Sequence, residues 1–226
     1  NTKLRNLSLT NNKLRAAGIT AMSDGLQRNT ALRVLDVSGN SINAEGGLAI
    51  AELLRANDAI EHLNAARNYL SDAIPRIGHA LSTRSRQMRL LDLSSNRIDG
   101  PICRQLAQIL EGNRITVACL SLEDNDLGDA GMVPLYHAVK GTNTQFLDLS
   151  ATGLTHRSGV VVADLMTSCP ILNSLQLDGN NLGDDAGVEI ASGYGQSQGL
   201  TAINLERCGI GSRTVAALCD AFAKHR

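Results

Sequence analysis

Aromatic residues are scarce in this chain: phenylalanine, tyrosine and tryptophan together make up 2% of its 226 residues, and tryptophan is absent. The core must therefore be aliphatic, and 43% of the residues are hydrophobic. Proteins that bind single-stranded nucleic acid combine a basic groove with stacking aromatics, and the sequence offers neither feature. The charges almost cancel, with 21 Lys and Arg against 22 Asp and Glu. We therefore expect neither a nucleic-acid nor a membrane partner.

Cysteine pairs and long hydrophobic runs are also missing. The five cysteines are an odd number, and none forms a Cys-x-x-Cys pair, which argues against a disulfide framework and favours a reducing compartment. The sequence shows no signal-peptide pattern and no apolar run long enough to cross a bilayer. We therefore expect an intracellular, cytoplasmic protein, and an association with the cytoskeleton is one form this could take.

One stretch recurs along the whole chain, with the pattern L-x-x-L-x-L-x-x-N-x-L. Its Asn-type position, which we call the ladder position, is occupied in turn by Asn12, Asn40, Asn68, Asn96, Asn125, Thr152, Asn180 and Cys208. The steps between these residues are 28, 28, 28, 29, 27, 28 and 28. A fixed period of this size predicts a solenoid of stacked repeats.

The repeats begin near residues 4, 32, 60, 88, 117, 144, 172 and 200, so residues 1–226 form a single repeat domain. Solenoids normally carry polar capping elements, and neither end of this sequence shows one. We therefore expect the chain to be a segment of a larger protein.

Each repeat predicts a short strand, a turn at the ladder residue and a helix of about three turns. In the first repeat the helix is expected near residues 17–28, and in the second we expect Leu48, Ala51 and Leu54 to face the core. Pro101 and Pro134 are expected near helix starts, and Asp184-Asp185 at a helix N-terminus. The glycines of the stretch 192–197 predict a frayed or shortened helix in repeat 7.

The repeat pattern resembles the ribonuclease-inhibitor-like class of leucine-rich repeats, and the resemblance covers the whole chain. It implies an α/β fold: a right-handed horseshoe with a parallel sheet on the concave face and helices on the convex face. Packed helices need about 10 Å each and paired strands about 4.8 Å, which gives the same curvature. The class includes ribonuclease inhibitors, innate-immune sensor domains, Ran GTPase-activating proteins, actin-regulatory proteins and axonemal subunits.

The predicted concave face is acidic although the chain is nearly neutral. Its acids number seven (Asp36, Asp92, Glu123, Asp124, Asp148, Asp178 and Glu206) and its bases two (Arg67 and Arg207). Leu90, Cys119 and Phe146 add an apolar stripe on successive strands. We therefore predict a contact for a basic or amphipathic protein segment, with Leu90, Asp92, Cys119, Ser121, Glu123, Phe146, Asp148 and Asp178 as the partner-binding residues.

No residue pattern predicts catalysis, a metal or a cofactor. Cys119 and His62 occupy equivalent positions two strands apart, roughly 2 × 4.8 Å, which is too far for a nucleophile and its base. The acidic stretch 124–129 lacks the ligand spacing and the late Glu of a calcium loop. The sequence therefore predicts a non-enzymatic protein without a cofactor.

The functional prediction is a protein–protein interaction scaffold that binds its partner on the concave face. The alternative is a regulatory protein of the GTPase-activating or actin- or axoneme-regulating class, for which the loop residues Arg15, Arg97 and Arg157 are candidates. A third possibility is an immune-sensor segment, which would require a nucleotide-binding oligomerisation domain elsewhere in the protein.

Overall fold

The computed structural model describes residues 2–112 and 117–224. The strands are β1 (Asn6–Ser8), β2 (Val34–Asp36), β3 (His62–Asn64), β4 (Met88–Asp92), β5 (Val117–Ser121), β6 (Phe146–Asp148), β7 (Ser174–Gln176) and β8 (Ala202–Asn204). The helices are α1 (Arg15–Leu26), α2 (Ala44–Ala56), α3 (Ile74–Ser82), α4 (Gly100–Gly112), α5 (Gly128–Val139), α6 (Gly159–Ser168), α7 (Gly183–Tyr194) and α8 (Ser212–Lys224). Short 3-10 turns, η1 (Ser71–Ala73) and η2 (His156–Ser158), precede α3 and α6.

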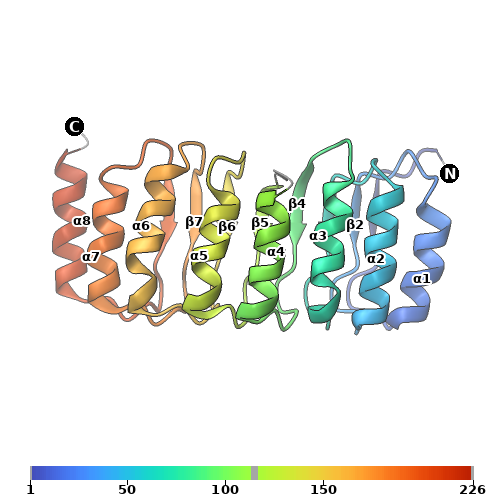
Figure 1. Cartoon of the computed structure of the whole chain (residues 1–226), viewed down its shortest axis with the longest axis horizontal. Coiled ribbons are helices and arrows are strands. Elements are labelled where there is room, and N and C mark those ends of the chain that lie inside the picture. The colour runs from blue at the N-terminus through green and yellow to red at the C-terminus, as the bar shows by residue number, and fades with distance from the viewer. Residues whose placement is uncertain (1, 113–116, 225–226) are drawn as a thin grey trace.

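The strands form one parallel sheet in the order β1 to β8, so every strand pairs with the strands of the adjacent repeats. Figure 1 shows the helices as one layer in front of the strands, with the two ends of the chain at opposite ends of the molecule. The solenoid fold and its eight repeats are thereby confirmed.

The core lies between the sheet and the helix layer, at the inward positions of the repeat. The central residues of neighbouring strands are in register, as in Leu63 with Leu91 and Leu91 with Leu120. Each of these leucines is at most 2% exposed. The period-2 pattern therefore assigned the buried side of each strand correctly.

The ladder residues satisfy the backbone where each strand ends. Asn96 donates from Nδ2 to the carbonyls of Leu93 and Ser94 in its own repeat and Ala65 in the previous one, each at 3.0 Å. Thr152 has no amide: its Oγ1 donates to the Leu149 carbonyl at 2.6 Å and reaches Asn180 Oδ1 of the next repeat at 3.5 Å, but among the described contacts it bonds no carbonyl of the previous repeat. Asparagine therefore links neighbouring repeats with bonds that threonine cannot supply.

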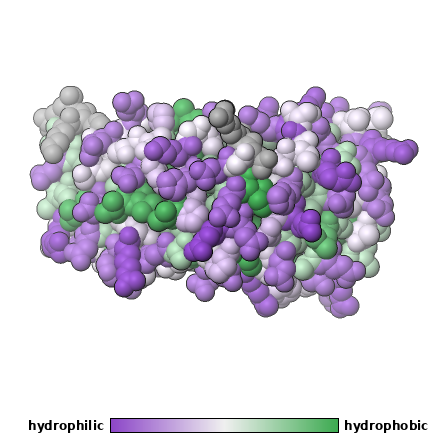
Figure 2. All heavy atoms as spheres, in the orientation of Figure 1, coloured by the Kyte–Doolittle hydropathy of each residue, from purple (hydrophilic) through white to green (hydrophobic). Residues whose placement is uncertain are grey.

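The helices differ from the sequence prediction in register and in facing residues. Helix α1 begins and ends two residues before the expected range. In α2, Leu48 is 47% exposed, whereas Ile50, Leu53 and Leu54 are buried. On a helix with about 100° per residue, a step of three residues ends about 60° short of a full turn. Leu48 and Leu54 are two such steps apart, so their side chains point about 120° apart and cannot share one face. The helix-covered side is mixed, with hydrophobic patches among hydrophilic residues (Figure 2).

Two local predictions were wrong. Helix α7 has 12 residues and is neither frayed nor short, because its glycine at position 193 fits against α6: a Cβ there would lie 2.7 Å from the Ala163 Cα. Pro134 lies inside α5 rather than near its start. The proline removes one helix hydrogen bond, but Ala130, whose carbonyl loses that bond, is exposed and can bond to water.

Candidate functional site

The predicted apolar stripe runs across three strands in register. Leu90 pairs with Cys119, and Cys119 pairs with Phe146. All three side chains are half-buried, so they form part of the sheet surface and do not project as exposed anchors. Burial raises the pKa of the Cys119 thiol, which keeps it protonated and poorly nucleophilic at neutral pH.

The aspartates of the neighbouring row have a structural role that the sequence analysis missed. Asp92 accepts hydrogen bonds from the Ser94 backbone N–H at 3.0 Å and from its hydroxyl at 2.6 Å. Asp36 binds Ser38 in the same way, at 2.9 and 2.7 Å. These contacts close the turn after each strand. The recurring Asp-x-Ser sequence at positions 36–38, 92–94 and 148–150 is a signal that could have revealed this role.

Two of the predicted acids are engaged in such contacts away from the centre of the face. Asp148 accepts from the Ser150 backbone N–H at 3.0 Å. Asp178 accepts from the Ser150 hydroxyl at 2.6 Å and from Asn204 at 3.0 Å, and forms an ion pair with Arg207 at 3.2 Å. Much of the Asp178 charge is therefore already balanced.

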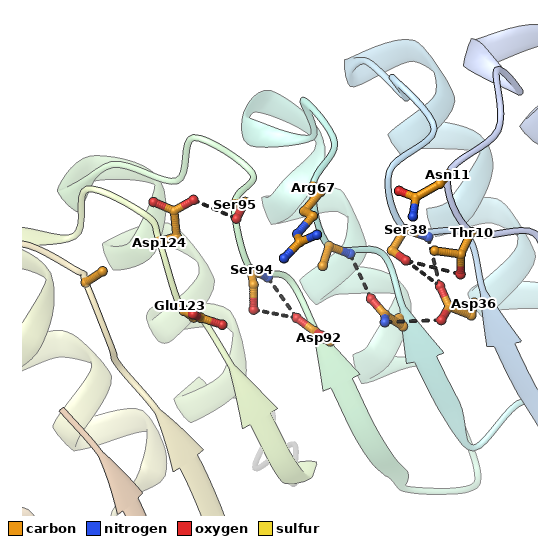
Figure 3. Close-up of a pocket in the computed structure, with 13 residues that line it drawn as sticks. Thr10, Asn11, Asp36, Ser38, Arg67, Asp92, Ser94, Ser95, Glu123 and Asp124 are labelled. Atoms are coloured by element: carbon orange, nitrogen blue, oxygen red, sulfur yellow. Dashed lines mark hydrogen bonds between the residues drawn. The ribbon is translucent and has the colours of Figure 1, made fainter. Parts of the chain in front are cut away.

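A hollow of about 550 Å³ lies on the sheet side, where the strands end. We call it the acidic basin, after its acids Asp36, Asp92, Glu123 and Asp124, against which its single base is Arg67. Figure 3 shows these side chains arriving from successive strands and the loops that follow them. Of the eight predicted site residues only Asp92 and Glu123 line this basin.

The remaining predicted residues lie beside the basin. Ser121 borders it, with its hydroxyl 2.8 Å from that of Ser94, whereas Leu90, Cys119, Phe146, Asp148 and Asp178 do not line it. Conversely, the basin is also lined by Asp36, Asn64 and Arg67 of repeats 2 and 3. These three residues were not among the predicted partner-binding residues.

Glu123 lies close to several other acidic residues of this face. Although the residue is exposed, its pKa is raised, first by partial desolvation and then by Asp148, Asp178, Asp92 and Asp124. In the described part of the chain, its carboxylate forms no ion pair with a base. The carboxylate is therefore held among like charges, and a cation from another molecule would relieve that repulsion.

The structure offers no geometry for the chemistry that was considered from the sequence. His62 pairs with Leu90, which pairs with Cys119, so the thiol and the imidazole lie two strands apart. Across residues 2–112 and 117–224, no group of three or more His, Cys, Asp or Glu side chains is placed to hold a metal ion. None of the helices described is both long and apolar enough to cross a membrane.

Comparison with known families finds a match to a family described as Leucine Rich repeat, at residues 1–23, 28–51, 110–135 and 168–191. Over 84 residues the chain is 39% identical to the mouse and rat proteins named NACHT, LRR and PYD domains-containing protein 3. That stretch is 36% of this chain and 8% of each relative, so the chain spans a small part of their length.

Solved structures with related folds share little sequence with the chain. The actin-binding site 2 of leiomodin-1 is 19% identical with a TM-score of 0.49, covering 61% of this chain and 82% of that one. The tropomodulin C-terminal domain of Caenorhabditis elegans is 9% identical with a TM-score of 0.34, covering 99% and 85%. Because both TM-scores are below 0.5, neither likeness supports a conclusion about this chain.

Proposed function

The chain is a leucine-rich-repeat protein, and we propose that it acts as a protein-interaction scaffold whose acidic basin binds a basic segment of a partner. The observation that carries this proposal is the accumulation of acids around Glu123, where partial desolvation and four neighbouring aspartates raise the pKa. Negative charge gathered in a hollow attracts a basic partner and increases its association rate.

The half-buried stripe of Leu90, Cys119 and Phe146 supports the amphipathic part of the proposal. These residues precede the basin along β4, β5 and β6. A partner segment that places basic residues in the basin can lay an apolar side chain on the stripe. Such an arrangement of apolar contact beside charged groups is common in protein interfaces.

A regulatory role in GTP hydrolysis or in the cytoskeleton is the alternative. It relied on a loop arginine, and the candidate Arg97 is stacked over the Tyr69 ring, 4.4 Å from its centroid. Among the residues described, no contact favours this role over the scaffold. A GTP-hydrolysis assay across small GTPases separates the GTPase-activating role from the scaffold, because a scaffold leaves the rate unchanged. The limited match to the mouse and rat relatives does not extend their other domains to this chain.

The scaffold proposal is tested by identifying proteins retained from a lysate by three immobilised forms of the chain. These are the parent, the basin variant Asp92→Lys with Glu123→Lys, and the control Asp164→Lys. The control reverses a charge on an exposed residue of α6, on the helix side. Circular dichroism and thermal melting should first show that all three forms are folded.

We expect a partner with a basic segment to be held by the parent and the control and lost by the basin variant. Its retention should also weaken as salt rises, because exposed charge pairs are screened over about 10 Å at 0.1 M salt. Equal retention of the same partner by the parent and the basin variant would place the binding surface elsewhere.

A further inference from the structure

A second row of side chains lies on the rim of the solenoid, one residue after each ladder position. In repeats 3 to 6 this rim position is occupied by Tyr69, Arg97, Asp126 and Gly153. Across these four adjacent repeats, the rim position therefore carries an aromatic ring, then a guanidinium, then a carboxylate, and finally no side chain.

Tyr69 is exposed for no evident structural reason. Its side chain is 46% exposed, although it belongs to a central repeat and not to an end of the solenoid. The whole chain has only five Phe and Tyr residues. Phe222 is exposed as well, at 55%, but it lies on the last helix and packs edge-on against Tyr194, with 5.4 Å between ring centroids. The Tyr69 ring is instead covered on one side by the Arg97 guanidinium, at 4.4 Å.

The stack holds Arg97 in place without neutralising it. Among the residues described, no carboxylate lies within ion-pair distance of the Arg97 guanidinium. The attraction between a cation and the face of a tyrosine ring favours this orientation of the Arg97 side chain. Tyr69 and Arg97 together line one wall of the hollow beside them.

This wall borders a groove of about 660 Å³, which we call the rim groove; its other walls include Asp99, Asp124, Asp126 and Gly153. Asp99 caps α4 by accepting from the Ile102 N–H at 2.9 Å. Asp126 is uncovered on the side of repeat 6, where a Cβ on residue 153 would lie 3.3 Å from its Oδ1. The groove carries three carboxylates against one guanidinium.

The rim groove and the acidic basin are continuous. Ser95, Asp124 and Ala151 line both hollows, and Ser95 donates its hydroxyl hydrogen to Asp124 at 2.7 Å. These residues are shared by two hollows that are both rich in carboxylates. An extended polypeptide lying in the basin can therefore reach the rim groove along an electrostatically favourable path.

We propose that the rim groove is a specificity site for an arginine side chain of the partner segment that occupies the acidic basin. This inference rests on the proposed function and adds the residue type that the site selects. The partner guanidinium pairs with Asp126 while its flat face lies along the wall of Tyr69 and Arg97.

Arginine fits this groove better than lysine for a geometric reason. A guanidinium is planar, weakly hydrated and able to form two parallel hydrogen bonds with one carboxylate, whereas an ammonium group is a compact and strongly hydrated charge. Flat stacking and pairing with Asp126 can therefore occur together only for arginine. The basin, which has no comparable aromatic wall, should accept either cation.

The test uses fluorescence anisotropy of a labelled peptide in which arginines alternate with Gly-Ser pairs, and of its lysine counterpart. The proteins are the parent, the rim variants Tyr69→Ala and Asp126→Asn, the basin variant Glu123→Gln, and the control Asp164→Asn on the helix side. We expect the parent to bind the arginine peptide about 3- to 10-fold more tightly than the lysine peptide, within the range for one partly exposed charged contact.

Each rim variant should reduce this arginine preference to near unity, whereas Glu123→Gln should weaken both peptides and leave their ratio unchanged. Equal binding of the two peptides by the parent, or a ratio that survives both rim substitutions, overturns the rim groove as an arginine site and leaves the basin proposal standing. Rim variants that abolish the preference while Glu123→Gln weakens neither peptide contradict the basin and support the rim site. Failure of both peptides to bind the parent contradicts both proposals.

Discussion

At the scale of single residues, aspartates four positions after the ladder residue connect one repeat to the next. Asp129 accepts hydrogen bonds from the Thr155 N–H at 2.9 Å, the Thr155 hydroxyl at 2.6 Å and the Ser158 hydroxyl at 2.5 Å. Asp184 lies in the first turn of α7, as predicted, and also accepts from the N–H groups of Gly211 and Thr214. An acid that the sequence assigned to its own helix therefore also stabilises the start of the following one.

The contacts of Asp129 predict a pH-dependent stability. Burial by itself would raise the pKa of this carboxyl, but hydrogen bonds from Ser158 and Thr155, with the charge of Arg157, outweigh it and lower the pKa. The contribution is therefore complete above the unfolded-state pKa of about 3.9 and is lost as the pH falls through the lower folded-state pKa. We expect Asp129→Asn to cost about 0.5–1.5 kcal/mol of unfolding free energy at pH 7, because the amide cannot accept hydrogen bonds at both of its terminal atoms as the carboxylate does.

Urea unfolding at pH 7 and near pH 3 would check this prediction, with Asp164→Asn as the control for loss of an exposed charge. The difference between parent and Asp129→Asn should shrink at the lower pH, because below a pKa of about 3.9 the carboxyl is largely protonated in the unfolded chain, which lowers the gain from ionising it on folding. A loss of the same size at both pH values would show that shape, and not charge, accounts for the effect.

At the scale of elements, glycines decide how closely neighbouring helices pack. A Cβ at position 193 would lie 2.7 Å from the Ala163 Cα and 2.8 Å from its Cβ, which is too close without movement of a helix. We therefore expect Gly193→Ala to destabilise the protein by about 1–3 kcal/mol through overpacking, although alanine is the better helix former.

Gly25 provides the matched control, because it lies in α1 and a Cβ there would meet nothing within 4 Å. Gly25→Ala should stabilise the protein by about 0.4–1 kcal/mol. Thermal or urea unfolding of both variants would measure the two effects. If both substitutions stabilised the protein, helix propensity would outweigh packing at position 193 as well, and the close fit of α7 against α6 would not limit stability.

The difference between local propensity and packing contacts explains which elements the sequence could predict. Strand register followed from the period, because residues such as Leu63 and Leu91 occupy equivalent positions and pair directly. Helix details depended on three-dimensional contacts: the glycine of α7 fits a neighbour that is 30 residues away in sequence, and Leu48 points outward on α2. Propensity and spacing alone contain no information on those contacts.

At the scale of the whole molecule, the sequence predicted the acidic character of the sheet face but not the shape of the hollow. Asp92 and Glu123 were predicted and line the basin, whereas Asp36 and Arg67 complete it from repeats 2 and 3. Side-chain direction also determined what each acid does, since Asp148 and Asp178 bind Ser150 and lie outside the basin. A repeat pattern places residues on a face without giving these local contacts.

Acids inside and outside the basin act together on Glu123: Asp92 and Asp124 line the basin, whereas Asp148 and Asp178 lie outside it. A raised pKa means that the charged form is disfavoured in the folded protein, so at neutral pH this residue reduces stability, and the penalty disappears as the pH falls and the carboxyl is protonated. Binding sites often keep such unfavourable groups because the partner supplies the missing interaction. The position of Glu123 among like charges therefore favours a positively charged partner.

The most direct test is an NMR pH titration of the Glu123 side-chain carboxyl, with and without a saturating basic peptide of alternating lysines and Gly-Ser pairs. We predict a pKa above the ordinary glutamate value of about 4.3 in the free protein, and a lower pKa in the complex, because a bound cation favours the carboxylate. An ordinary Glu123 pKa in the free protein, or a raised pKa that the peptide leaves unchanged, would contradict the basin as the partner-binding surface.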